Sequence, residues 1–137
     1  MLLLLSLCGL LDAKAQSVST EELKGTWTVA SVTYAANDYT SAELARVEPL
    51  RKAFLDATFT FKKKKHFTFS INFEGLGIKD AQWQLDDTAH AIVIREWKDK
   101  GSGKSELMLI KTKKDNGRII FMLDETLLVL EMKKQLE

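Results

Sequence analysis

The sequence has little cysteine, histidine or excess charge. Its 137 residues include one cysteine, Cys8, two histidines, His66 and His90, and a net charge of +1. A lone thiol forms no disulfide within the chain, and two histidines far apart without cysteine companions lack the spacing of a zinc site. Nucleic-acid binding calls for a strongly basic face, and the net charge of +1 argues against it. We therefore expect no metal, no cofactor and no nucleic-acid partner.

Apolar runs long enough to span a membrane are also missing. The N-terminal run, Leu2–Leu11, is uncharged but falls short of the ~20 residues of a spanning helix. The residues that follow, Ala13-Lys14-Ala15-Gln16, fit the small-x-small pattern of signal-peptidase cleavage. We expect residues 1–15 to be an export signal and residues 16–137 to be one domain, periplasmic or secreted.

Cleavage after Ala15 would remove Cys8, so the mature domain must be stabilised by packing alone. A lipoprotein cysteine follows a small residue, whereas Leu7 precedes Cys8. We therefore do not expect lipid tethering through this residue.

Catalytic motifs are absent as well. The chain has no Gly-x-Ser-x-Gly elbow, phosphate loop or His-Glu-x-x-His motif. Gly101-Ser-Gly103 lacks the third glycine of a dinucleotide-binding motif. The adjacent Asp86 and Asp87 would point to opposite faces of a strand, so a turn explains them better than a catalytic carboxylate pair. We expect a binding protein and not an enzyme.

Two capping boxes mark the helices. Ser19-Thr20-Glu21-Glu22 predicts a short helical turn, and Gly25 stands where a C′ glycine would end it. Thr40-Ser-Ala-Glu43 opens a second segment with apolar residues at helical spacing. Pro49 lies inside this segment and predicts a kink between two short helices.

Strands are predicted for most of the remaining chain. Apolar and polar residues alternate in Phe59-Thr-Phe61 and from Phe67 to Phe73, as in half-buried antiparallel strands. The other predicted strands are Trp27–Tyr34, Ala81–Leu85, Ala91–Arg95, Glu106–Ile110, Ile119–Leu123 and Leu127–Glu131.

Short turn signals separate these strands. They are Asp86-Asp87, Gly101-Ser-Gly103, Asp115-Asn116-Gly117 and Asp124-Glu125, with Asn116-Gly117 typical of a type I′ turn. Consecutive strands should therefore be neighbours in the sheet. About eight antiparallel strands joined in this way predict a closed up-and-down barrel, with the helical segment between its first two strands.

The segment Leu23-Lys-Gly25-Thr-Trp27 resembles the Gly-x-Trp motif of lipocalins (calycins), and the strand order is similar to small exported bacterial lipocalin-like domains. The resemblance implies that Trp27 closes one end of the barrel. It also implies an arginine stacked on this tryptophan, where the sequence offers only Lys133 and Lys134. The Thr-Asp-Tyr motif is absent too, so no particular ligand is carried over from the family.

One face of three predicted strands is rich in aromatic residues. As the lining of an apolar pocket, this face would hold a small apolar or amphipathic ligand. As a filled core, it would supply the burial that a chain without disulfides needs. Both interpretations concern the same residues: Phe59, Phe61, Phe67, Phe69, Ile71, Phe73, Trp83 and Leu85.

Two basic features complete the candidate sites. The run Lys62–Lys65 could attract an anion, a phosphate head group or an anionic cell-wall polymer, although a solvated hairpin tip is the simpler interpretation. Arg95 either points into the barrel toward a ligand carboxylate or points outward, because the preceding apolar run shows no alternation.

These patterns support two functional hypotheses. The first is an exported lipocalin-like protein that binds a small apolar or amphipathic molecule at the open end of the barrel. The second is a filled barrel that acts as an inhibitor or interaction module and meets an envelope protein through its loops or helical segment.

Overall fold

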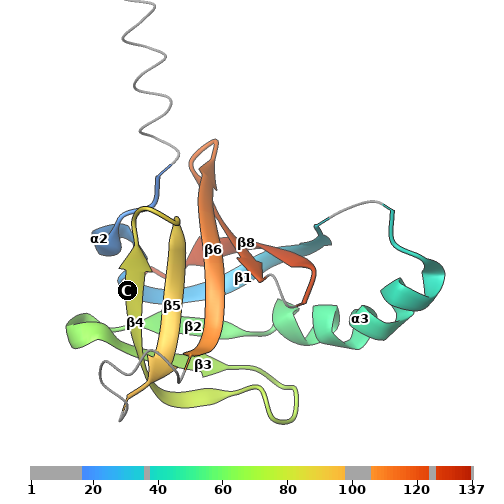
Figure 1. Cartoon of the computed structure of the whole chain (residues 1–137), viewed down its shortest axis with the longest axis horizontal. Coiled ribbons are helices and arrows are strands. Elements are labelled where there is room, and N and C mark those ends of the chain that lie inside the picture. The colour runs from blue at the N-terminus through green and yellow to red at the C-terminus, as the bar shows by residue number, and fades with distance from the viewer. Residues whose placement is uncertain (1–16, 36–37, 98–105, 124–125, 137) are drawn as a thin grey trace, which may run out of the picture.

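The computed structural model describes residues 17–35, 38–97, 106–123 and 126–136. These residues form eight antiparallel strands that close into a barrel in the order of the sequence, with β8 pairing back onto β1 (Figure 1). The predicted up-and-down barrel is confirmed.

The strands follow the predicted pattern, with differences in length. Their bounds are β1 Gly25–Tyr34, β2 Thr58–Phe61, β3 His66–Ser70, β4 Ile78–Asp86, β5 Ala91–Glu96, β6 Glu106–Asp115, β7 Arg118–Leu123 and β8 Leu128–Lys134. The alternating pattern had predicted that β3 would continue to Phe73, but the strand ends at Ser70. Its partner β4 begins only at Ile78, which pairs with Phe69, so the intervening residues form a connection outside the ladder.

Both predicted capping boxes are present. The helix α2 (Thr20–Leu23) is capped by the Ser19 hydroxyl, which accepts from the Glu22 amide at 3.1 Å. The helix α3 (Ser41–Leu55) is capped in the same way by Thr40, which accepts from Glu43 at 3.1 Å. In each case the N3 glutamate bonds back to the cap amide, so two free helix amides are satisfied.

The predicted break at Pro49 is wrong. Residues 41–55 form one helix with Pro49 in its interior. The side chain of Pro49 is exposed, whereas Phe54 near the helix end is buried and stacks on Phe69 of β3, with ring centroids 5.8 Å apart. Tertiary contacts of Phe54 with Phe69, and of Glu48 with Tyr34 at 2.6 Å, therefore outweigh the cost of the proline.

Two predicted turns are confirmed. Asn116 and Gly117 have φ angles of 52° and 80° between β6 and β7, as a type I′ turn requires. Asp86 accepts from the amides of Thr88 and Ala89, which closes the turn between β4 and β5. Gly101-Ser-Gly103, Asp124-Glu125 and the expected export signal lie outside the described residues.

The hairpin order gives the barrel two different ends. The α2 end carries α2, the β2–β3 connection, and the β4–β5 and β6–β7 turns. The α3 end carries α3 between β1 and β2, together with the β3–β4 connection. Figure 1 shows α2 and α3 on opposite sides of the barrel. In the described part of the chain, no helix has the length and apolar character needed to cross a membrane.

Candidate functional site

The barrel interior holds most of the predicted aromatic face. Inward side chains from β2, β3 and β4 are at most 2% exposed: Phe59, Phe61, Phe67, Phe69 and Trp83. The Phe59 and Phe69 ring centroids are 4.6 Å apart, and those of Phe61 and Trp83 are 5.3 Å apart. At these separations the rings pack directly against one another. The space between these strands is therefore occupied by side chains, as in the filled-core interpretation.

A central member of this cluster, Phe121 of β7, was not among the predicted site residues. Its ring centroid lies 5.5 Å from that of Phe59, 6.0 Å from that of Phe61 and 6.3 Å from that of Trp27. Phe121 lies within an unbroken apolar run, Ile119–Leu123. Because such a run has no alternation, the sequence does not tell which of its members point inward.

The remaining members of the predicted aromatic face lie near the margins of the strands. Ile71 follows the end of β3 and is half-buried against the core, and Leu85 is half-buried near the end of β4. Phe73 lies in the β3–β4 connection and is 39% exposed, so it does not line the interior. The structure thus brings together the predicted residues of β2, β3 and the middle of β4, and leaves Phe73 apart.

Arg95 lies on the outer face of the barrel. It pairs in register with Gln82, whereas the neighbouring inward residues Ile94 and Trp83 pair with each other. Because successive residues of a strand point to opposite faces, Arg95 cannot reach the interior. Its Nε atom is buried without a hydrogen-bond partner in the described structure.

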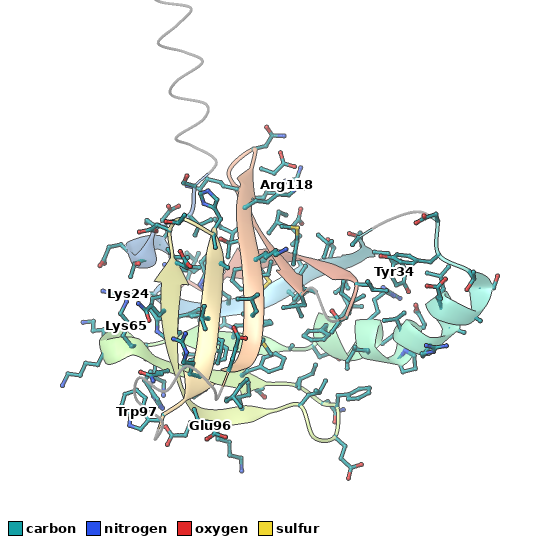
Figure 2. All side chains as sticks on the ribbon, in the orientation of Figure 1. Lys24, Tyr34, Lys65, Glu96, Trp97 and Arg118 are labelled. Carbon is teal, nitrogen blue, oxygen red and sulfur yellow. The ribbon has the colours of Figure 1, made fainter. Side chains whose placement is uncertain are left out.

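A cleft opens at the α3 end, between the β3–β4 connection and the adjacent ends of β4, β5 and β6. Its volume is about 580 Å³. Its apolar lining consists of Leu76, Ile78, Trp97, Leu107 and Met108, and its charged lining of Lys79, Asp80 and Glu96. Figure 2 shows Glu96 and Trp97 together at the end of β5.

The floor of the cleft belongs to the barrel core. Ile78 and Met108 are half-buried and pack against the core cluster. Leu76 and Leu107 are more open, with Leu107 43% exposed. The cleft therefore combines a fixed apolar floor with accessible apolar and charged walls, the arrangement that an amphipathic molecule requires.

A histidine supports one wall of this cleft from the outer face. The Nε2 atom of His66 lies 2.8 Å from Oδ1 of Asp80, and its ring meets Trp97 edge-on at 5.3 Å between centroids. Both Asp80 and Trp97 line the cleft. His66 thus holds a polar and an aromatic wall residue in fixed positions.

A second hollow adjoins the cleft. Its volume is about 390 Å³, and it lies between Thr68–Ile71 and Gly77–Lys79. The two hollows share Gly77, Ile78 and Lys79, which follow the irregular register between β3 and β4. The two hollows therefore meet at the start of β4, beside the irregular register.

The helix α3 is tied to the same end of the barrel by a polar cluster. The Glu48 carboxylate accepts hydrogen bonds from Arg51, at 2.6 and 2.9 Å, and from the Tyr34 hydroxyl at 2.6 Å. The hydrogen bonds from Arg51 and then Tyr34 lower the pKa of Glu48 to about 2. The bond to Glu48 in turn raises the pKa of Tyr34. Glu48 is therefore charged in the folded protein and anchors α3 to β1.

The Gly25 and Trp27 motif lies at the α2 end. Trp27 is buried, and its indole nitrogen donates to the Leu23 carbonyl at 2.8 Å. Lys134 lies over the ring, with Nζ 5.6 Å from the centroid, and donates to the Glu22 carbonyl at 3.0 Å. Lysine thus occupies the place where the family resemblance implied an arginine. Gly25 has a φ of +131°, and a Cβ there would lie 2.8 Å from Lys134 Cε.

The fold and the cleft define this chain as a closed antiparallel β-barrel with a packed interior and a ligand-sized cleft at the α3 end. Within the described residues, no three histidine, cysteine or acidic side chains are grouped so as to hold a metal ion.

Comparison with known proteins gives one similar structure. No protein-family model matches the sequence, and no curated protein matches it. The crystal structure of a DUF4847 family protein from Bacteroides vulgatus is similar over 82% of this chain and 95% of that chain, at 17% identity and a TM-score of 0.46.

Proposed function

We propose that this protein is an exported, lipocalin-like binding protein that holds a small apolar or amphipathic molecule without transforming it. The cleft at the α3 end carries this proposal. Ligand pockets in proteins usually measure roughly 300–1,000 Å³ and combine apolar lining with a few polar groups. The cleft of about 580 Å³ has this size and composition.

The packed interior moves the proposed site from inside the barrel to its mouth. Phe59, Phe61, Phe67 and Phe69 then form the core that supports the floor of the cleft. Trp97 supplies an aromatic wall, and Lys79 and Glu96 supply charges at the edge. An amphipathic ligand would lay its apolar part over Ile78 and Met108.

A fluorescent probe tests the site. We expect the neutral apolar dye N-phenyl-1-naphthylamine to bind with one-to-one stoichiometry and to change Trp97 fluorescence. Leu107→Glu places a charge in the cleft and should weaken binding at least about tenfold, because an unpaired charge resists transfer to an apolar surface. Leu55→Glu is the matched control, since Leu55 is similarly exposed but lies on α3 outside the cleft lining.

Two results would contradict the proposal. One is a lack of saturable binding by the unmodified protein. The other is equal binding by the two glutamate variants, which would place the dye somewhere other than the cleft.

The alternative is an interaction or inhibitor module for an envelope protein. The packed interior favours it, as do Phe73 and Leu76, which are exposed together on the β3–β4 connection. Phe73 lies outside the cleft lining, so Phe73→Ser separates the hypotheses. The small-ligand hypothesis predicts unchanged dye binding, whereas the interaction hypothesis predicts loss of a co-purifying envelope protein.

A further inference from the structure

The connection between β2 and β3 consists of four consecutive exposed lysines, Lys62–Lys65. Lys63–Lys65 form the short turn η1. Among the described residues, no acidic side chain forms an ion pair with Lys62, Lys63 or Lys64. Their positive charges therefore face solvent without compensation.

The backbone of this turn does not explain its lysines. Lys64 and Lys65 have φ angles of 61° and 65°, in the left-handed region that glycine and asparagine adopt most easily. At the β6–β7 turn, the same chain uses Asn116 and Gly117 for such angles. Lysine has no advantage in this conformation, so the turn geometry does not account for the run.

The turn is fixed to the barrel. The Trp83 indole donates to the Lys62 carbonyl at 3.1 Å, and Nζ of Lys65 lies 4.7 Å from the centroid of the same ring. The Lys62 amide also donates to the His66 carbonyl at 2.8 Å. Lys62–Lys64 are therefore presented on a rigid base.

The charges near this surface are paired with one another. Lys24 follows α2, and Figure 2 shows it beside Lys65. The nearby acidic groups are already engaged, since Glu21 pairs with Lys24 at 2.9 Å and Glu22 pairs with Lys114. The pKa of Glu21 is lowered by its hydrogen bond and charge interaction with Lys24, and further by the charge of Lys65.

The turns at the α2 end that carry acidic residues lie apart from the β2–β3 connection. Asp86 and Asp87 belong to the β4–β5 turn and Asp115 to the β6–β7 turn, which Figure 1 shows apart from the β2–β3 connection. We call the surface formed by Lys62–Lys65 the lysine face.

The geometry points to a docking surface for an anionic membrane, with the lysine face against the phosphate groups of the lipids. Clustered lysines bind anionic bilayers through summed charge attraction without a shaped pocket. Binding of single-stranded nucleic acid would also use aromatic rings that stack on bases, but Trp83 beneath the turn is 1% exposed. None of the lysines of this face lines the cleft, so docking here would not place them in the proposed ligand site.

The place where the N-terminal segment joins the barrel supports a membrane as the partner. The described chain begins at Ser17 and enters the barrel through α2, beside the lysine face. The preceding sequence contains the apolar run Leu2–Leu11. The expected export signal is therefore joined to the α2 end, so until cleavage after Ala15 it would hold the lysine face close to the membrane.

Vesicle binding tests the inference. The full chain should bind vesicles of phosphatidylglycerol and phosphatidylcholine and bind pure phosphatidylcholine much less, with binding that weakens as salt rises. The triple variant Lys62→Gln, Lys63→Gln, Lys64→Gln should lose at least about tenfold in affinity, since each lysine near an anionic surface contributes about fivefold.

The control removes three charges away from the lysine face through Arg46→Gln, Lys52→Gln and Lys113→Gln, which lie outside the cleft lining, and it should bind like the unmodified chain. All variants keep residues 1–16, so any contribution of the apolar run is the same in each. Equal loss in both triple variants, or equal binding to both kinds of vesicle, would overturn the inference. Dye binding in the cleft should be unaffected by the lysine variant, so this test is independent of the proposed function.

If the triple variant folds poorly, the single charge reversal Lys63→Glu replaces it. Lys63 has no ion pair among the described residues and a φ outside the left-handed set. The Lys63→Glu variant should bind anionic vesicles more weakly, and its unfolding midpoint should be unchanged. Unchanged binding would contradict the proposed surface.

Discussion

At the scale of single residues, the backbone of Gly25 and its contact with Lys134 explain why β1 begins with a glycine. A side chain at Gly25 would be strained by the φ of +131° and would also meet the Lys134 stem at 2.8 Å. The backbone conformation is fixed by β1, whereas the lysine stem is flexible and can move. Two separable costs therefore act on any substitution at this position.

We predict that Gly25→Ala lowers the free energy of unfolding by about 1–3 kcal/mol, the usual cost of a strained backbone position. Measured relative to Lys134→Ala alone, Gly25→Ala should cost only slightly less, because the contact is relieved but the φ strain stays. Gly77→Ala is the control, since a Cβ there would meet Phe69 at an ordinary 3.7 Å. Urea unfolding midpoints measure all the variants. A Gly25→Ala change without cost in the Lys134→Ala background would show that the contact alone requires the glycine.

At the scale of secondary-structure elements, α3 shows how tertiary contacts outweigh a local preference. Proline costs about 3 kcal/mol relative to alanine inside a helix, yet Pro49 lies within one continuous helix. The helix is held by Glu48 bonded to Tyr34 and Arg51, and by Phe54 stacked on Phe69. Tyr34 belongs to β1 and Phe69 to β3, which a pattern confined to residues 41–55 does not include.

Pro49→Ala should therefore raise the free energy of unfolding by about 1–3 kcal/mol. Pro49 is exposed, so the change removes no packing. Lys52→Ala, also exposed on α3, should change stability by less than about 0.5 kcal/mol. Urea denaturation of both variants is the measurement. A loss of stability in the proline variant would mean that the helix needs a proline-induced bend to reach the barrel.

The Glu48 cluster makes the attachment of α3 depend on pH. A carboxyl whose pKa is lowered on folding contributes stability above its unfolded pKa, and this stability is lost as the pH falls through the folded value. For Glu48 the values are 4.5 and about 2, so the contribution should disappear as the pH falls from 4.5 toward 2.

Because other carboxyls titrate in the same range, the measurement is the difference in unfolding midpoint between the unmodified protein and Glu48→Gln. We expect this difference to be largest above pH 4.5 and to shrink as the solution is acidified. A difference that stays constant with pH would show that the charge of Glu48 does not anchor the helix.

At the scale of the whole molecule, the packing of the interior decides where a ligand can bind. The Phe121 ring meets rings from β1 and β2 at the centre of the barrel. Phe121→Ala should cost about 3–5 kcal/mol and leave an apolar cavity. Such a cavity stays dry and accepts small aromatic molecules.

We therefore expect benzene to raise the thermal midpoint of the Phe121→Ala variant but not that of the unmodified protein. Phe73→Ala is the control, because Phe73 is exposed and its loss should create no cavity. Equal stabilisation of the unmodified protein by benzene would show that its barrel already contains a site large enough for a ligand.

Particular residues show how far sequence patterns predict the candidate site. The alternation in Phe59-Thr-Phe61 and Phe67-Thr-Phe69 correctly identified two strands and their buried face. The same alternation continues to Phe73, where it failed because β4 offers no partner beyond Ile78. The cleft was missed, since its lining comes from three segments that meet only in the folded chain.

The sequence by itself determined the features that depend on neighbouring residues: the capping boxes, the Asn116-Gly117 turn, and the number and order of the strands. Tertiary structure decided the outward direction of Arg95, the seat of Lys134 over Trp27, the continuity of α3 and the presence of the cleft. The physical reason is the distance along the sequence between the residues that interact. Capping and turn formation involve residues within about four positions, whereas register, ring packing and clefts depend on strands brought together by closure of the barrel.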